Sequence, residues 1–484
     1  MRKVLAFNLT GRVINGLLPL YFLPGFFFLL GPESFGFYCL LLSVQAILGF
    51  LDIGISSTVT REFSRKMIIE NKASILTTFE RLHMIVGACV VVVSITTIAF
   101  IENFLPLSLS KIDDGISPLA CGIFLITSWP LPFYSGALIG GELQIHLNII
   151  NFFSGVSRYG LGYLILSMTE YGISGLLYWQ AITFIATVIT MRSLLVRHVA
   201  DGLVKGRFSL DIIRIRRQYI MNLFGISLIG ASLSQLDKII LPALIGLESF
   251  GFYSLAAALA AALMVTTHPI ISTYFPRFVQ ALETRDTSTI EKSFKSCALA
   301  LSILVLAPST VAIVQPAAAF RLWTGRVEDM GVAVAFLPLL TLAAHAGIFT
   351  ALLQSLHTAG GKPHHVLVTN VTQFVALLAG FSLAYILKES RLAIWTLLVV
   401  QITGLIMLIY FLPTIKRELS WRILNYPLIV ASVAYVSAAF SGYLIEQVEL
   451  TNFVGLLGVP LVLIVTSVTL VSSVLWAKTV RLKS

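Results

Sequence analysis

Charged residues are scarce in this sequence. Only 12% of the 484 residues are Asp, Glu, Lys or Arg, whereas soluble domains carry roughly 25%. The mean hydropathy is +0.91, so a soluble fold of this composition would have too little polar surface to remain dispersed in water. A bilayer accepts an apolar exterior, and the composition therefore excludes a soluble protein and predicts a membrane protein.

Catalytic and metal-binding motifs are also missing. The four cysteines, Cys39, Cys89, Cys121 and Cys297, are not paired at metal-ligand spacing and suggest no disulfide framework. The stretch Gly360-Gly361-Lys362-Pro363 lacks the upstream glycine and the Ser or Thr of a phosphate-binding P-loop. No zinc or Ser-His-Asp pattern occurs. We therefore expect no metal, no cofactor and no enzymatic activity.

Long apolar runs are abundant instead. A helix that crosses a membrane needs about 20 apolar residues, and fourteen such runs can be traced. They lie near residues 12–30, 35–59, 80–101, 116–138, 145–168, 172–192, 219–245, 249–275, 294–315, 330–355, 364–387, 391–412, 422–445 and 450–477. The sequence thus predicts an all-α polytopic membrane protein with about 14 transmembrane helices.

The basic residues alternate between the predicted connections. With the N-terminus inside, 26 of the 33 lysines and arginines fall in inner segments and five in outer loops, while Arg158 and Lys238 lie within spans. Cytoplasmic loops carry an excess of Lys and Arg, so the alternation supports fourteen spans and predicts that both termini are cytoplasmic. The net charge of +10 follows from this placement and does not indicate binding to nucleic acid.

One segment of the chain occurs twice. Gly31–Tyr38 reads GPESFGFY and Gly246–Tyr253 reads GLESFGFY, with six identical residues in succession. Both copies are predicted to join two spans on the outer side, so two groups of six spans form a parallel repeat. The predicted parts are a first lobe, a basic amphipathic cytoplasmic linker, a second lobe, and two additional spans with a basic tail: 1–192, 193–218, 219–412 and 413–484.

Four segments carry a family resemblance: Asn8-Leu9-Thr10-Gly11, the turn Leu30–Tyr38, the stretch from Leu51 to Arg61, and Leu236–Leu241. They resemble the polysaccharide-transporter branch of the multidrug/oligosaccharidyl-lipid/polysaccharide exporter superfamily, and within it the O-antigen flippases of the Wzx type. The resemblance implies an undecaprenyl-pyrophosphate-linked oligosaccharide as substrate, moved from the cytoplasmic to the periplasmic leaflet of the bacterial inner membrane. It also implies contact with membrane lipid, and a polysaccharide polymerase and a chain-length regulator as partners.

Ionisable groups within spans are the candidate site residues. Each costs about 2.5–3.5 kcal/mol at the helix centre and usually faces a cavity or a partner. They are Asp52, Arg158, Asp237, Lys238, His268 and His345. Arg158 lies deep in its span, and a guanidinium can bind phosphate oxygens bidentately. We expect it to bind the pyrophosphate; the alternative is a structural ion pair with Asp52 or Asp237.

The remaining charged candidates have two interpretations each. Asp237 and Lys238 are adjacent, so their side chains diverge by about 100° on a helix and are not expected simply to neutralise each other; Lys238 lines the substrate cavity or snorkels to the outer interface. Asp52 pairs with a basic group or carries a proton. Arg12 and Arg61 bind the incoming pyrophosphate at the inner mouth or anchor the topology.

Four further residues are predicted to act in coupling or gating. His268 and His345 can titrate near neutral pH and couple transport to protons, or they are packing residues. Pro19 and Pro24 loosen the first span, as a gate or as an ordinary kink.

The sequence therefore predicts an alternating-access flippase, with three rivals left open. A multidrug extruder of the same superfamily typically has twelve spans. A lipid II flippase has fourteen, but several arginines would be expected to line its first lobe. A membrane polysaccharide polymerase usually has a large outer loop, and the longest predicted here covers only about residues 102–117.

Overall fold

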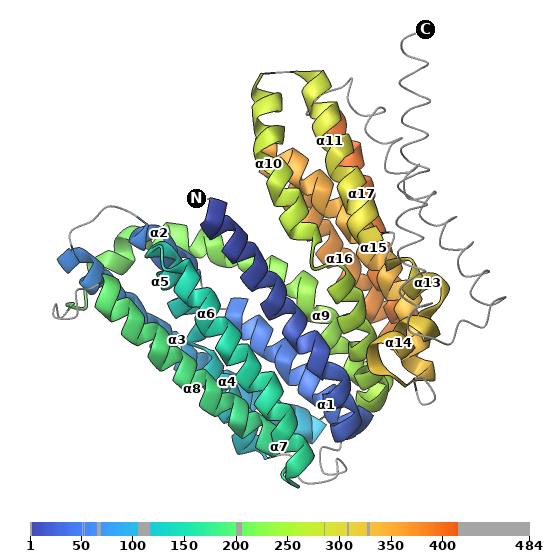
Figure 1. Cartoon of the computed structure of the whole chain (residues 1–484), viewed down its shortest axis with the longest axis horizontal. Coiled ribbons are helices and arrows are strands. Elements are labelled where there is room, and N and C mark those ends of the chain that lie inside the picture. Colours follow the sequence, from blue (N-terminus) through green and yellow to red (C-terminus); the bar gives the residue numbers. More distant parts are fainter. Residues whose placement is uncertain are drawn as a thin grey trace. The chain divides into compact units, whose positions relative to one another are not determined.

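The computed structural model describes residues 2–50, 52, 54–64, 69–104, 117–199, 206–284, 286–306, 309–326 and 330–414. Every regular element within these residues is a helix, which confirms the predicted all-α fold (Figure 1). The chain divides into two compact units, Met1–Ser254 and Leu255–Ser484. The two additional predicted spans, 422–445 and 450–477, lie outside the described residues.

The first unit is built from long helices interrupted by short breaks. Its elements are α1 (Arg2–Phe50), α2 (Ile55–Phe63), α3 (Ile69–Phe104), α4 (Pro118–Ser128), α5 (Leu131–Gly140), α6 (Gln144–Gly155), the π-helical turn η2 (Val156–Leu161), α7 (Gly162–Met168), α8 (Gly172–Val199) and most of α9 (Leu210–Leu263). Helix α1 packs on α6 and α7, α4 packs on α8, and α2 packs on α5. One predicted span is thus divided into α4 and α5, and the next into α6, η2 and α7.

The second unit is also built from helices that are interrupted by short breaks. Its elements after α9 are α10 (Thr267–Glu283), α11 (Thr287–Leu301), the π-helical turn η3 (Ser302–Leu306), α13 (Val311–Val314), α14 (Pro316–Thr324), α15 (Gly331–Ala359), α16 (Pro363–Leu387), α17 (Ser390–Phe411) and the 3-10 turn η4 (Leu412–Thr414). Helices α15 and α16 both pack on α17, and α10 packs on α11 and α15. Prolines open α4, α14 and α16, where the missing N–H would have no helical partner.

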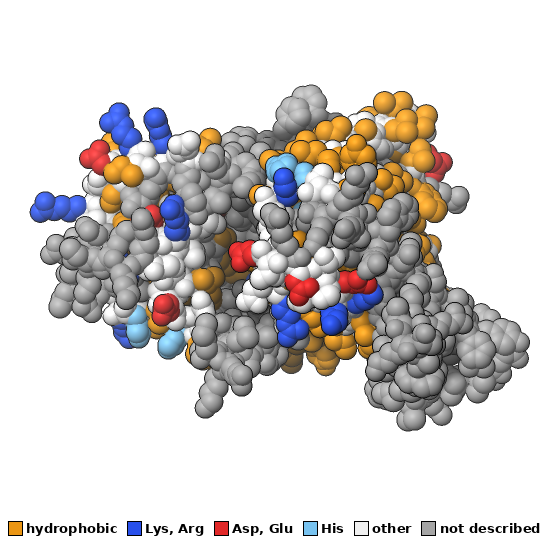
Figure 2. Space-filling view, turned by 90° about the horizontal axis from the view of Figure 1, so that it is seen from above, with side chains coloured by type: hydrophobic (Ala, Val, Ile, Leu, Met, Phe, Trp, Pro, Cys, Tyr) orange, Lys and Arg blue, Asp and Glu red, His pale blue; other side chains and the backbone are white. Residues whose placement is uncertain are grey.

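Apolar side chains cover the outside of these helices. Seven helical stretches among the described residues are long and apolar enough to cross a membrane. On α8, Ile182, Ile185 and Ile189 are 46–59% exposed at a spacing that places them on one helix face. Figure 2, which looks from above, shows hydrophobic side chains on the surface beside Lys and Arg side chains. Such apolar stripes fit lipid, and the chain is a multi-pass membrane protein.

The repeated segment adopts the same backbone conformation in both copies. Gly31 interrupts α1 with φ 75° and ψ 163°, and Gly246 interrupts α9 with φ 78° and ψ 162°. A positive φ of this size is readily accessible only to glycine. The repeat read from the sequence therefore corresponds to two equivalent turns, each of which separates two predicted spans.

The two turns also contact each other within the first unit. A Cβ on Gly36 would lie 2.2 Å from the carbonyl oxygen of Leu247, and a Cβ on Gly251 would lie 2.0 Å from that of Pro32. Leu247 and Pro32 occupy equivalent positions in the two copies. The same close backbone approach thus occurs twice with the roles exchanged, as around a two-fold axis.

The connection between the sixth and seventh predicted spans is shorter than expected. Helix α8 continues to Val199, and α9 already begins at Leu210. The last part of the predicted basic amphipathic linker, from Leu210 onward, is the first part of α9, where Ile212 packs on a core cluster of the first unit. The charged residues do not end these helices, because arginine and lysine are good helix formers.

Candidate functional site

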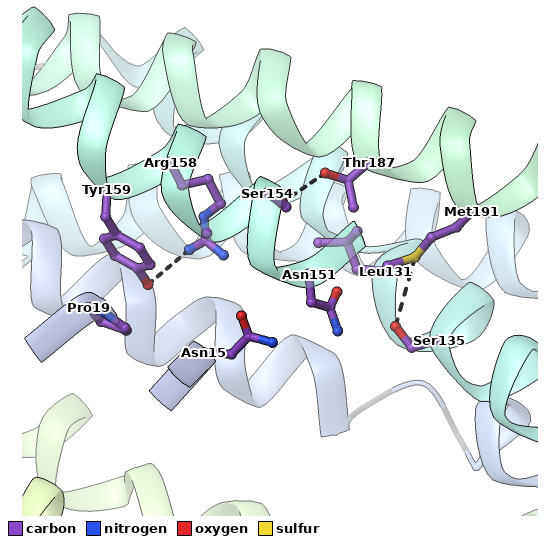
Figure 3. Close-up of a pocket in the computed structure, with 11 residues that line it drawn as sticks. Asn15, Pro19, Leu131, Ser135, Asn151, Ser154, Arg158, Tyr159, Thr187 and Met191 are labelled. Atoms are coloured by element: carbon purple, nitrogen blue, oxygen red, sulfur yellow. Dashed lines mark hydrogen bonds between the residues drawn. The ribbon is translucent and has the colours of Figure 1, made fainter. Parts of the chain in front are cut away.

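A cavity of ≈ 220 Å³ lies inside the first unit (Figure 3). It is lined by residues of α1, α5, α6, η2 and α8: Asn15, Pro19, Leu131, Ser135, Asn151, Ser154, Gly155, Arg158, Tyr159, Thr187 and Met191. Among the described residues that line it, Arg158 is the one charged side chain, and none carries a carboxylate. The cavity therefore has the electrostatic character of a site for an anion.

Arg158 is positioned by the π-helical turn η2 and by its attachment to α8. The Trp179 indole N–H donates to the carbonyl oxygen of Ser157 at 2.9 Å, and the Ser157 hydroxyl lies 3.1 Å from that of Thr183. One further hydroxyl bond, from Thr187 to Ser154 at 2.8 Å, joins α8 to α6. Single π-helical turns are rare and frequently occur at functional sites.

The Arg158 side chain is held by aromatic rings rather than by a carboxylate. Its guanidinium carbon lies 4.5 Å from the ring centre of Phe184 and 5.0 Å from that of Tyr159, and one terminal nitrogen donates to the Tyr159 hydroxyl at 3.3 Å. Its Nε is buried without a hydrogen-bond partner. Among the described residues, no ion pair includes Arg158, so most of its five N–H donors are available to a ligand.

Asp52 caps a helix instead of pairing with Arg158. Its two carboxylate oxygens accept hydrogen bonds from the backbone N–H groups of Gly54 at 2.9 Å and Ser56 at 3.0 Å. The prediction that Asp52 lies within a continuous span is wrong, because α1 ends at Phe50 and α2 begins at Ile55. The carboxylate stabilises the first turn of α2, where orphan backbone donors need an acceptor.

Asp237 and Lys238 pair with each other. Lys238 Nζ lies 3.5 Å from Asp237 Oδ1 and donates to the Ser234 carbonyl at 2.8 Å. The other Asp237 oxygen accepts the Tyr253 hydroxyl at 2.6 Å. The expectation that adjacency prevents neutralisation is wrong, because the flexible lysine stem folds back along α9. Neither residue lines the cavity.

Of the other predicted inner-mouth and gate residues, only Pro19 is among the described residues that line the cavity. Arg61 is an exposed residue in the last turn of α2, and Arg12 lies outside the part of the chain whose side chains are described. Pro19 lines the cavity, whereas Pro24 does not. Both prolines lie within α1, and the backbone of this helix departs from helical φ and ψ at Gly31. A gating role for the prolines stays a prediction.

The two predicted histidines belong to the second unit and are not among the residues that line the cavity. His268 is exposed on α10, and His345 is buried on α15 within hydrogen-bond distance of the Ser309 hydroxyl. Of the predicted site residues, the structure brings Arg158 and Pro19 to one cavity. Proton coupling through either histidine stays a prediction.

Sequence reasoning missed the polar neighbours of Arg158. Asn151, Ser154 and Arg158 follow at intervals of three and four residues, which places them on one helix face. A polar stripe of this kind within an otherwise apolar span was a readable signal. Asn15 and Thr187, on α1 and α8, join this face only through the packing of the helices.

Comparison with known proteins identifies the family of this chain and the fold that it shares with solved structures. The model of the polysaccharide biosynthesis protein family matches residues 2–282, and the chain belongs to this family. No curated protein matches the sequence.

Solved structures of the MOP superfamily share the fold. One is the lipid II flippase MurJ in an inward closed conformation, with a TM-score of 0.71 at 11% identity over 99% of each chain. A second is an inward-facing multidrug resistance MATE transporter, with a TM-score of 0.63 at 12% identity over 86% of this chain and 95% of the other. A third is a MOP transporter from Pyrococcus furiosus described as having a binding pocket of reverse polarity, with a TM-score of 0.55 at 15% identity over 87% of this chain and 96% of the other.

Proposed function

We propose that this protein is a flippase that moves an undecaprenyl-pyrophosphate-linked oligosaccharide, such as an O-antigen repeat unit, from the cytoplasmic to the periplasmic leaflet of the bacterial inner membrane by alternating access. Family membership and the fold shared with MOP transporters support a transporter of this kind. A polysaccharide polymerase and a chain-length regulator are its proposed partners, and both of its termini are cytoplasmic in this proposal.

The observation that carries the proposal is the chemistry of the Arg158 cavity. Arg158 has no carboxylate partner among the described residues and lies among neutral polar groups in a membrane-embedded unit. Such an arginine is costly unless an anion accompanies it during part of the transport cycle. A pyrophosphate supplies oxygens that match the planar fork of the guanidinium. In this hypothesis the glycan occupies an aqueous space and the lipid chain remains in the bilayer.

The rival transporters differ in what this cavity must hold. A multidrug extruder would have no need of an arginine aimed at an oxyanion. A lipid II flippase would carry a closely related diphosphate, and the expected cluster of first-lobe arginines is represented in the described cavity by Arg158 alone. These two rivals, together with a membrane polymerase, are therefore tested by which lipid-linked intermediate accumulates when the protein is absent.

The deciding experiment deletes the gene in its native host and measures lipid-linked intermediates and surface polysaccharide. We expect complete undecaprenyl-pyrophosphate repeat units to accumulate on the inner side while surface polymer is lost. The wild-type gene should restore the polymer, Arg158→Ala should not, and Arg197→Ala should, because Arg197 is exposed on the same unit away from the cavity. Normal polymer without a trapped intermediate would contradict the flippase function.

A further inference from the structure

Two asparagines face the space into which Arg158 extends. Asn15 comes from α1 and Asn151 from α6, whereas Arg158 comes from the π-helical turn η2. Figure 3 shows all three side chains directed toward the same cavity. The three groups thus approach one volume from three elements, which allows them to surround a small ligand.

Two of these three side chains have a polar atom without a partner. Oδ1 of Asn15 and Nε of Arg158 are both buried and accept or donate no hydrogen bond in the described structure. Buried polar atoms are satisfied in the great majority of cases, and an unsatisfied one calls for an explanation. Rotation of a carboxamide by 180° exchanges its oxygen and nitrogen, so Asn15 can present N–H donors to the same position.

The charge of this group of residues selects the class of ligand. The guanidinium contributes one positive charge, and the two carboxamides contribute donors without adding a negative charge. Phosphate and diphosphate oxygens accept several hydrogen bonds at once and bind arginine bidentately. A carboxylate at either asparagine position would instead neutralise Arg158 and repel the anion.

We propose that Asn15 and Asn151 form, with Arg158, a three-residue oxyanion site that selects a diphosphate group by neutral donors around a single cation. The inference rests on the proposed function for the source of the diphosphate, which is a lipid headgroup; free inorganic pyrophosphate has the same chemistry. In this proposal the two asparagines are specificity-determining residues.

The test uses the purified full chain and single-residue variants. Isothermal titration measures binding of inorganic pyrophosphate in detergent and of a polyprenyl diphosphate in nanodiscs. We expect Asn15→Asp and Asn151→Asp each to weaken binding by about tenfold or more, since each replaces donors to a charged ligand by a like charge. Asn15→Ser, which keeps a donor, should bind more tightly than Asn15→Asp, and Asn148→Asp, on the same helix α6 but outside the lining, should bind as the wild type does.

Each result has a defined meaning. Weakened binding of both probes assigns the site to the lipid headgroup, and weakened binding of free pyrophosphate alone assigns it to a free anion. Wild-type affinity in both Asp variants, or no binding of either probe to the wild type, would overturn the inference. Each variant should elute from size-exclusion chromatography as a monodisperse peak. This control distinguishes a loss of binding from misfolding. The deletion strain tests the flippase function, whereas the titration tests the three-residue oxyanion site. A negative result in the deletion strain therefore does not change what the titration shows about the site.

Discussion

At the scale of the residue, Arg158 illustrates how aromatic rings can hold a cation inside a membrane protein, since no carboxylate in the described part of the chain pairs with it. The rings of Phe184 and Tyr159 lie 4.5 and 5.0 Å from its guanidinium carbon. Cation–π contacts are worth about 0.5–2 kcal/mol each, with the larger values where water is excluded. The rings therefore orient the guanidinium while its N–H edge remains available to an anion.

Arg158→Lys tests whether the planar shape of this cation matters. Lysine retains the charge but provides a compact ammonium without the bidentate fork. We expect pyrophosphate binding to weaken by about tenfold, since hydrogen bonds to a charged ligand contribute about 1.5–3 kcal/mol. Titration calorimetry on the purified variant measures the loss. Affinity equal to that of the wild type would mean that charge alone is recognised.

Asp286 provides a second residue-scale prediction, outside the membrane spans. Its carboxylate accepts bonds from the Thr289 hydroxyl at 2.6 Å, the Ser288 hydroxyl at 2.8 Å and the backbone N–H groups of both residues. These bonds, with the Thr289 hydroxyl first, lower the pKa of Asp286 to about 2. Because the unfolded value is about 3.9, the cap stabilises α11 above about pH 4 and is lost as the pH falls toward 2.

We expect Asp286→Ala to increase amide exchange at the start of α11 at neutral pH. The difference from the wild type should shrink as the pH falls from about 5 to 3. Hydrogen exchange followed by mass spectrometry on the peptide that contains residues 286–292 measures both effects. Asp286→Asn, which keeps one acceptor oxygen, serves as the control. Equal exchange in the wild type and Asp286→Ala would show that the cap contributes nothing.

At the scale of the element, the repeated turns depend on glycine for contact as well as for conformation. Gly36 and Gly251 allow two backbones to approach at a distance that a side chain would block. Close helix approach through small residues is a general means of packing in membranes, where the hydrophobic effect does not drive helices together. The same device brings α2 against α5, where a Cβ on Gly136 would lie 2.7 Å from the Ser56 carbonyl oxygen.

Gly36→Ala and Gly251→Ala should each destabilise the first unit. Their Cβ atoms would meet backbone oxygens at 2.2 and 2.0 Å, and backbone cannot move aside as a flexible side chain can. Overpacking of this kind costs about 1–3 kcal/mol. Thermal unfolding in detergent, followed by size-exclusion chromatography, measures the effect. Gly230→Ala is the matched control, because nothing lies within 4 Å of its new Cβ.

If both turn variants unfold at the same temperature as Gly230→Ala, the reciprocal contact is dispensable for stability. That result would leave the positive φ at Gly31 and Gly246 as the remaining reason for glycines in the repeated segment.

At the scale of the whole molecule, the proposed transport moves negative charge outward. An inside-negative potential favours that movement by about 2.3 kcal/mol per charge for each 100 mV. In proteoliposomes with a fluorescent lipid-linked oligosaccharide, we therefore expect faster flipping toward the positive side and slower flipping when the potential is reversed. If a cationic side chain such as Arg158 travels with the headgroup, the difference shrinks. No response to a potential of either sign would indicate an electroneutral cycle.

The spans, their apolar faces and the repeat were accessible from the sequence because each is a local property. A run of apolar residues is stable in lipid wherever it occurs, and the excess of Lys and Arg acts on neighbouring loops. Gly31 and Gly246 indicated equivalent turns because the same six residues follow two positions after each of them, and both glycines adopt nearly the same φ and ψ. The lobe boundaries and the cytoplasmic location of the termini, which were inferred from the same apolar runs and basic residues, stay predictions.

Only the tertiary structure decided what each buried charge does, because polar groups choose their partners by proximity in space. Asp52 was free to pair with Arg158 on sequence grounds, but a break before α2 gives it backbone donors two and four residues away. Asp237 is bound by Tyr253, sixteen residues farther on. The meeting of Asn15 with Asn151 and Arg158 required α1 to pack on α6. Hydropathy is additive along a chain, whereas a hydrogen bond between helices depends on how they are packed.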